Sequence, residues 1–278
     1  MRPVHIPSYV TNNLRLGNMT EQAAVVWMHQ RNVYLRFYEP EISILVPAYN
    51  ERDFILKTIF SLTNSSTKRK YEIIVINNNS TDDTEAVVKK TGVRHLQETV
   101  QGITAARNAG LGAARGKYIL NADADVIYPP DWIDEMIAPL ERPDVAVSYG
   151  RFAFLPDKTT PRWKYYVYEC IADTLRFIRR KWGEEAVNVY GFNFGFRKEQ
   201  GIAVDWFNHP RGAHEDGWMA LKLRDKGFGK LHLVHHKKAM VWSLDRRLQN
   251  DGGLWKGFKK RMRQFFLKET EPHKGLPG

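Results

Sequence analysis

Residues 117–125 read KYILNADAD: an apolar run leads directly into two carboxylates, Asp123 and Asp125, that stand one residue apart. We predict a strand over residues 117–122, because the run is short, apolar and followed by polar residues. Alternate side chains of a strand share a face, so the two carboxylates can point to one place. Paired oxygen donors suit a hard cation such as Mg²⁺ or Mn²⁺, which can hold a diphosphate. An isolated Asp-x-Asp is more often a solvated turn, so its surroundings decide the interpretation.

The chain before this stretch alternates between strand and helix patterns. Helices of ~10 residues between short apolar strands indicate parallel pairing through right-handed crossovers. We therefore predict an α/β fold with a Rossmann-like, mostly parallel central sheet that carries helices on both faces. The predicted strands are 42–49, 71–76, 93–96 and 117–122, and the predicted helices are 54–62 with Asn50 as cap, 82–90 and 102–115.

Beyond residue 125 the alternation loosens, without an internal repeat or a linker between independent domains. We divide the chain into a partly helical N-terminal extension (1–40), one large domain (41–250) and a C-terminal tail (251–278). Thr20 is the expected cap of a helix over residues 20–38. The later predicted elements are helices 131–140, 160–181 and 215–226 and strands 145–154, 188–197, 231–234 and 239–242.

The composition is that of a globular protein with an excess of positive charge. Of 278 residues, 43% are apolar, and the single cysteine, Cys170, excludes internal disulfides and cysteine-rich zinc sites. No stretch approaches the ~18 apolar residues of a membrane span, and the first residues lack the apolar core of a signal peptide. We therefore expect a cytoplasmic protein. The net charge of +11 fits nucleic acid, anionic lipid or a phosphorylated small molecule as partner.

The tail carries much of this charge. Residues 256–268 alternate basic and aromatic side chains in a pattern that fits an amphipathic helix. Such a helix could lie on an anionic membrane surface, which would make the protein peripheral at the inner membrane face. It could equally pack its phenylalanines on the body of the protein and leave its lysines and arginines in water.

Three polar clusters follow three of the predicted strands. They are PAYNE at residues 47–51, NNNSTD at 77–82 and DAD at 123–125. Open parallel sheets bind their ligands beyond the carboxyl ends of the strands. Any one cluster could be turn chemistry, but three at successive strand ends predict a nucleotide-sized site at that edge.

These clusters, with GITAARNAG at 102–110 and the Glu215-Asp216 pair, resemble the family 2 glycosyltransferases of the GT-A fold. The resemblance covers about residues 41–250, with 41–126 as the nucleotide-binding half and 127–250 as the acceptor-binding half. It implies an inverting transfer of a sugar from a nucleotide-diphospho-sugar to a hydroxyl of a glycan or lipid-linked saccharide. It also implies Mg²⁺ or Mn²⁺ as cofactor and no nucleic-acid partner.

The resemblance assigns roles to residues on the donor side. Asn77 and Asn78 stand where the family usually has two Asp, one of which binds the N–H of uracil. An amide donates as well as accepts hydrogen bonds, so thymine and guanine stay open as bases. We favour a UDP-sugar as the donor. Asp125 is the expected metal ligand, and Asp123 with Ala124 is expected at the ribose or donor sugar. The remaining donor-side residues are Pro47, Ala48, Tyr49, Glu51, Arg107 and the loop residues Ser243, Arg246 and Arg247, which are suited to phosphate contact.

The acceptor side needs a base that takes the proton of the attacking hydroxyl. The resemblance implies Asp216 in this role, with Glu215 as its neighbour in support. The alternative is that both acids only begin a helix, where negative charge is favoured. If the resemblance holds, the pair Asp123 and Asp125 and the pair Glu215 and Asp216 must lie on opposite sides of one sugar. The residues expected to line the acceptor site are Phe192, Asn193, Trp206 and Trp218.

The identity of a further metal ligand stays open. It could be His232, His235 or His236, or Asp125 could bind the cation with only phosphates and water beside it. Two other functions also stay open. A nucleotidyltransferase would want a glycine-rich basic loop after the first strand, which residues 47–52 do not provide. A non-catalytic protein that binds nucleic acid or membrane would show a steep dependence of binding on salt.

Overall fold

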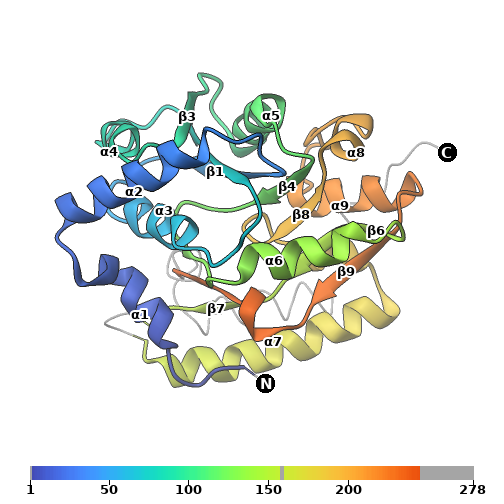
Figure 1. Ribbon diagram of the computed structural model, residues 1–278. Helices are drawn as coiled ribbons and strands as arrows, with labels where there is room; N and C mark the ends of the chain where they lie inside the picture. The colour runs from blue at the N-terminus through green and yellow to red at the C-terminus, as the bar shows by residue number, and fades with distance from the viewer. Residues whose placement is uncertain (1, 157–159, 245–278) are drawn as a thin grey trace.

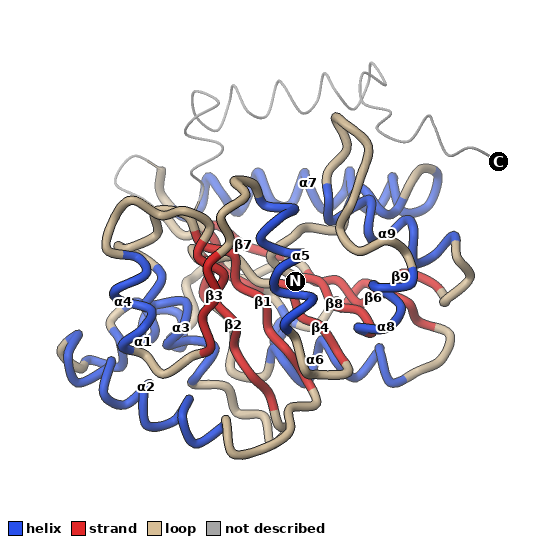
Figure 2. The backbone as a smooth tube through the Cα atoms, turned by 90° about the horizontal axis from the view of Figure 1, so that it is seen from above, coloured by secondary structure: helices blue, strands red, loops and turns tan. Residues whose placement is uncertain are grey.

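The computed structural model describes residues 2–156 and 160–244. A seven-stranded sheet forms its centre, in the order β3-β2-β1-β4-β8-β6-β9. Figure 2 shows these strands running side by side across the molecule. Their bounds are β1 Ile42–Ala48, β2 Tyr71–Asn77, β3 Arg94–Gln97, β4 Tyr118–Asn121, β6 Val145–Gly150, β8 Phe194–Arg197 and β9 Lys230–Val234.

The sheet is mixed but mostly parallel. Strands β1 to β4 are parallel to one another, β8 is antiparallel to both β4 and β6, and β9 is parallel to β6. The predicted α/β class is therefore confirmed. Because β8 runs the other way, its first residues lie at the edge where β4 and β6 end. One edge thus collects the carboxyl ends of β1, β2, β4, β6 and β9.

Helices cover both faces of this sheet, as Figures 1 and 2 show. Helices α2, α3 and α6 lie on one side, and α5 and α9 lie on the other. Strand β1 explains this arrangement: Ile44 and Val46 enter one hydrophobic cluster and Leu45 enters the other, as alternation across a pleat requires. The helices are α1 Ser8–Leu14, α2 Glu21–Leu35, α3 Ile55–Thr63, α4 Thr84–Lys90, α5 Ile103–Ala113, α6 Trp132–Ile137, α7 Arg162–Trp182, α8 Lys198–Ala203 and α9 Glu215–Asp225.

A second sheet of three strands, in the order β5-β10-β7, lies beside the first. Its strands are β5 Val126–Ile127, β7 Phe152–Phe154 and β10 Val241–Ser243. The single strand predicted over residues 145–154 is wrong, because the chain changes sheets at Arg151. The side-chain amide of Asn193 binds the main-chain oxygen of Arg151 at 2.8 Å and so satisfies the backbone where the ladder is interrupted.

Two further details of the sequence prediction differ from the structure. The strand predicted over residues 188–197 contains only β8, and the alternating aromatics before it form a loop in which Tyr190 and Phe192 stack with ring centroids 5.8 Å apart. Asn50 does not cap α3; it adopts a positive φ of 54°, and its side chain accepts the N–H of Thr81 at 2.8 Å. Thr20 does cap α2, since its hydroxyl accepts the N–H of Ala23.

Helix α7 is fastened to the body by a buried ion network. The carboxylate of Glu169, 1% exposed, accepts two hydrogen bonds from Arg162, one from Arg2 and one from the N–H of Phe154. Asp173, one turn later, binds Arg2 at 2.5 and 2.7 Å. In the described part of the chain, no helix is long and apolar enough to cross a bilayer.

Replacing Glu169 tests this network. Glu169→Gln keeps the shape but leaves Arg2 and Arg162 short of negative charge in a buried place, and we expect a loss of about 3–5 kcal/mol in the free energy of unfolding. Urea unfolding followed by circular dichroism measures it. Glu199→Gln, on the exposed first turn of α8, is the matched control and should change stability by less than about 0.5 kcal/mol. Equal effects of the two substitutions would contradict the network's importance.

Candidate active site

The turns after β1 and β2 are tied to each other. The N–H of Asn50 donates to the Ser80 hydroxyl at 3.0 Å, and the N–H of Glu51 donates to the Thr84 hydroxyl at 2.8 Å. Pro47 and Ala48 are buried at the end of β1, whereas Tyr49 is 51% exposed beside them. The first two predicted polar clusters therefore form one continuous rim with an exposed aromatic side chain.

Asn77 and Asn78 at the end of β2 are both buried and organise the neighbouring loop. The Asn78 amide donates to the main-chain oxygens of Glu98 and Val100, and its oxygen accepts the N–H of Gly102 at 2.7 Å. A carboxylate cannot donate these two bonds. The Asn78 amide thus holds the segment that leads into α5, while the Asn77 amide donates to the side chain of Gln97 at 2.7 Å. For a bound base, Asn78 retains only the second lone pair of its oxygen.

Arg107 of α5 lies at the centre of the site and is 1% exposed. Its guanidinium donates to Asn121 at 2.8 Å and to Asp123 at 3.1 Å, and its Nε lies 3.6 Å from a carboxylate oxygen of Glu215. The guanidinium also lies over the ring of Phe207, with 5.8 Å between the guanidinium carbon and the ring centroid. The end of β4 and the start of α9 therefore meet at one positive charge.

Asp216 is fixed by main-chain donors. Its two carboxylate oxygens accept the N–H of Gly191 at 2.6 Å and the N–H of Gly217 at 2.7 Å. Burial raises the pKa of Asp216, and the negative charge of Glu215 raises it further, while the two N–H donors and Arg107 oppose this shift. A carboxylate with a raised pKa accepts a proton more readily, which suits a general base.

Tyr128 holds the main chain of the acidic segment and was not predicted from the sequence. Its hydroxyl accepts the N–H of Asp123 and donates to the main-chain oxygen of Phe192, both at 3.0 Å. Burial, reinforced by the charge of Asp123, raises the pKa of Tyr128 well above its ordinary value, so the hydroxyl stays neutral. The hydroxyl of Thr58 in turn binds the main-chain oxygen of Ala124 at 2.8 Å. Both side chains restrain the position of the two carboxylates.

The four residues expected at the acceptor differ in what they present. Phe192 and Trp206 are partly exposed, and the Trp206 ring lies against Gly112 of α5. Asn193 and Trp218 are 0% and 6% exposed. The Asn193 amide bonds to the main-chain oxygens of Arg151 and Ala239 and accepts from the indole of Trp132. Asn193 thus has a structural contribution to the site: it joins α6, the end of β6 and the segment before β10.

The remaining predicted residues contribute less to the described site. Ser243 is 8% exposed, and its hydroxyl donates to the main-chain oxygen of Leu244. Arg246, Arg247 and the tail 251–278 lie outside the described residues. His236 bonds to Glu135 at 2.8 Å, and the ring of His235 lies 3.1 Å from Arg180. Burial and adjacent positive charge lower the pKa of His232 and His235.

A divalent cation fits the acidic segment. Asp123 and Asp125 supply hard carboxylate oxygens from partly exposed side chains at the sheet edge. Residues 2–156 and 160–244 contain no group of three or more His, Cys, Asp or Glu that could hold a metal. A cation at Asp125 would therefore complete its coordination with oxygens of the donor and water.

Such an edge on a mixed sheet, with polar turns after β1 and β2 and paired acids after β4, defines an α/β protein with a candidate ligand site at that edge. The model of glycosyl transferase family 2 matches residues 43–200, and the chain belongs to this family. An uncharacterized glycosyltransferase of Haemophilus influenzae is 34% identical over 121 residues, which cover 41% of this chain and 36% of that protein. A putative teichuronic acid biosynthesis glycosyltransferase of Bacillus subtilis is 27% identical over 135 residues, with 46% and 53% coverage. The chain thus spans about a third to a half of these relatives.

Solved structures share the fold. A mannosyltransferase from Pyrobaculum calidifontis in complex with GDP-Man and Mn²⁺ superposes with a TM-score of 0.57 at 19% identity, over 92% of this chain and 76% of that one. Glucosyl-3-phosphoglycerate synthase from Mycobacterium tuberculosis in complex with Mn²⁺, UDP-glucose and glycerol 3-phosphate gives a TM-score of 0.55 at 19% identity, over 86% and 83%. These similarities support the GT-A fold that the sequence predicted.

Gly191 offers a direct test of the site's packing. A Cβ at this position would collide with the Arg107 guanidinium and lie 3.5 Å from a carboxylate oxygen of Asp216. We expect Gly191→Ala to displace Arg107, to cost about 1–3 kcal/mol of stability and to abolish most activity. Thermal unfolding and an assay of nucleotide-diphosphate release measure both. Gly183→Ala, at the exposed end of α7 with its nearest neighbour atom at 3.2 Å, is the control; a normal rate in Gly191→Ala would contradict the arrangement.

Proposed function

We propose that the protein is a metal-assisted inverting glycosyltransferase that moves a sugar from a nucleotide-diphospho-sugar to an acceptor hydroxyl. The observation that carries this proposal is the contact of Arg107 with both Asp123 and Glu215. It brings the acids after β4 within reach of the acids that begin α9. A sugar bound between them would have its leaving group on one side and Asp216 on the other.

The residues divide the reaction between them. The acceptor oxygen forms a bond to the anomeric carbon while the bond from that carbon to the diphosphate oxygen breaks, and the hydroxyl proton passes to Asp216. Glu215 keeps the pKa of Asp216 raised through its charge. Arg107 and Tyr128 hold Asp123 toward the donor. A cation at Asp125 would neutralise charge on the departing diphosphate.

The donor and acceptor are proposed at the level that the site supports. The exposed Tyr49 and the rim of residues 47–51 and 77–82 would border the nucleoside. UDP-sugars come first, since several solved relatives hold UDP, UDP-GlcNAc or UDP-glucose, and a GDP-sugar is the second donor class. The acceptor is a glycan or lipid-linked saccharide. Contact of the basic tail with an anionic membrane stays a prediction, because the tail lies outside the described residues.

Nucleotide binding with and without metal tests the donor site. We expect one nucleotide diphosphate to raise the melting temperature in the presence of Mn²⁺, because a ligand that binds only the folded state stabilises it by mass action. Asp125→Ala should remove the metal-dependent part of this increase. Asp225→Ala, at the exposed end of α9, changes the net charge equally and should retain it. If no nucleotide stabilises the protein, the proposed function fails.

The dependence of the rate on pH tests the base. Only ionised Asp216 accepts a proton, so kcat/KM should fall on the acid side at a pH above the ordinary pKa of 3.8 for an aspartate. Glu215→Gln removes a negative charge that raises the pKa of Asp216, and the acid limb should therefore move to lower pH. Asp216→Asn should bind donor normally but lower transfer by about 10²-fold or more. The Glu199→Gln variant should leave the limb in place; a movement to higher pH in Glu215→Gln would refute the assignment.

A further inference from the structure

A second pocket lies at the same edge of the sheet, over its other half. The nucleotide rim stands over β2, β1 and β4, whereas this pocket stands where β6 and β9 end. Its walls are the segment from Gly150 to Phe152, the second half of α7, and Tyr190. The cavity has a volume of about 100 Å³, enough for a small polyatomic group.

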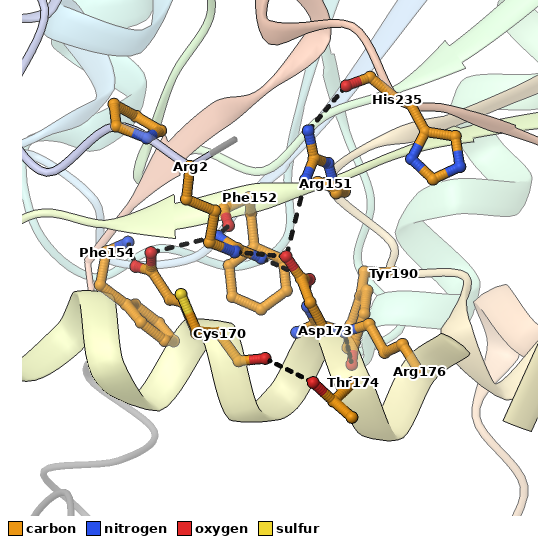
Figure 3. A network of polar contacts seen from close by, with 12 residues as sticks. Arg2, Arg151, Phe152, Phe154, Cys170, Asp173, Thr174, Arg176, Tyr190 and His235 are labelled. Atoms are coloured by element: carbon orange, nitrogen blue, oxygen red, sulfur yellow. Dashed lines mark hydrogen bonds and ion pairs between the residues drawn. The ribbon is translucent and has the colours of Figure 1, made fainter. Parts of the chain in front are cut away.

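Three arginines line this pocket and only one acid faces them. Arg151 follows β6, and Arg176 and Arg180 are on α7, while Asp173 is the single carboxylate in the lining. Figure 3 shows Asp173 projecting from α7 between Arg2 and Arg151, with Arg176 beside it. Another acid close to the pocket, Glu185, accepts a hydrogen bond from Tyr149 of the lining and forms no ion pair with these arginines in the described chain.

Asp173 cannot neutralise this cluster, because it also serves Arg2. It binds Arg2 at 2.5 Å and Arg176 at 2.7 Å and lies 3.6 Å from Arg151. The Nε of Arg151 is buried without a hydrogen-bond partner. Arg180 has no carboxylate partner among the described residues; its guanidinium contacts the ring of His235 at 3.1 Å. Positive charge therefore exceeds negative charge in the lining of the pocket, which favours the entry of an anion.

The titration of nearby groups agrees with this excess of charge. Burial lowers the pKa of His235, and Arg180 and Arg151 lower it further. Burial likewise lowers the pKa of Arg151, with Arg2 and Arg176 adding to the effect against the opposing charge of Asp173. Burial is the larger cause of both shifts and the neighbouring arginines add to it, whereas Tyr190 and Asp173 raise the pKa of Arg176 against its burial.

The aromatic walls hold the pocket in shape and connect it to the base. The Arg176 guanidinium lies over Phe152 at 4.8 Å and over Tyr190 at 5.4 Å, so its orientation is fixed before any ligand arrives. Tyr190 directly precedes Gly191, whose N–H donates to Asp216 at 2.6 Å. A group bound in the pocket thus lies next to the segment that orients the proposed base, on the side away from the nucleotide rim.

We propose that this pocket binds a phosphate monoester group of the acceptor, so that the acceptor is a phosphorylated saccharide. That the phosphate belongs to the acceptor rests on the proposed function. That the pocket binds an anion rests on the geometry of the pocket alone. A phosphate dianion matches an excess of two positive charges over Asp173, whereas a carboxylate would leave one uncompensated. Guanidinium groups also match phosphate oxygens in geometry. Arg2 and Arg162 serve the structure through Glu169, but Arg180 has no such structural acid.

Inorganic phosphate is the probe for this pocket. Isothermal titration of the full chain in a metal-free buffer with a chelator should show saturable binding, and acetate, as the carboxylate probe, should bind more weakly. Arg180→Gln should weaken phosphate binding about tenfold or more, as the loss of a charge-assisted hydrogen bond predicts. Arg180→Lys, which keeps the charge, should recover part of the affinity. Arg142→Gln, half-exposed at the far edge and paired with Asp144, removes an equal charge and should change nothing.

The outcomes separate this inference from the proposed function. If the wild-type protein does not bind phosphate saturably, or if Arg180→Gln and Arg142→Gln bind it equally well, the pocket is not an anion site. If acetate binds as tightly as phosphate, the phosphate assignment is wrong. Nucleotide stabilisation through Asp125 is measured independently, so its absence with intact, Arg180-dependent phosphate binding would overturn the transferase proposal alone.

Discussion

The burial of one guanidinium, that of Arg107, constrains the rest of the site. A charge removed from water must be paired and hydrogen-bonded, or the folded state loses several kcal/mol. Arg107 meets most of this requirement because Asn121 and Asp123 accept its hydrogen bonds at the end of β4 and Glu215 pairs with its charge from α9, while its Nε has no hydrogen-bond partner in the described chain. The same guanidinium leaves no room for a side chain at residue 191. Segments far apart in sequence are thereby brought to one point.

Much of the first half could be predicted because local patterns decide it. Buried parallel strands read as continuous apolar runs, and β1, β2 and β4 follow the predicted strands within one or two residues. The acids after β4 stood out because paired carboxylates at a strand end are unusual, whereas Arg107, in the middle of α5, and the Glu215-Asp216 pair were assigned through the family resemblance. Periodicity carries no information about which segments pair: it could not show that residues 189–193 form a loop, or that the chain leaves the sheet at Arg151.

The supporting residues escaped prediction for a related reason. Tyr128 matters because its hydroxyl binds the main chain of Asp123 and Phe192, and Gly191 matters because its own N–H donates to the carboxylate of Asp216. No residue type or spacing marks such contacts in advance. Asn78 shows the converse: its amide was noticed as a departure at the base-binding position, but its two N–H groups hold the loop before α5. The sequence alone drew attention to Asn78, and the fold was needed to show that its amide binds the main chain of Glu98 and Val100.

Strand β8 explains how one sheet edge could serve both proposed sites. It is inserted antiparallel between β4 and β6, so the segment before it, residues 190–193, lies between the two halves of the edge. On one side this segment meets Asp123 through Tyr128, and on the other Tyr190 packs against Arg176. Its Gly191 N–H binds Asp216 between them. A ligand on either side that displaced residues 190–193 would also displace the N–H of Gly191 from Asp216. The proposed donor site, the proposed base and the anion pocket therefore all depend on the position of this one segment.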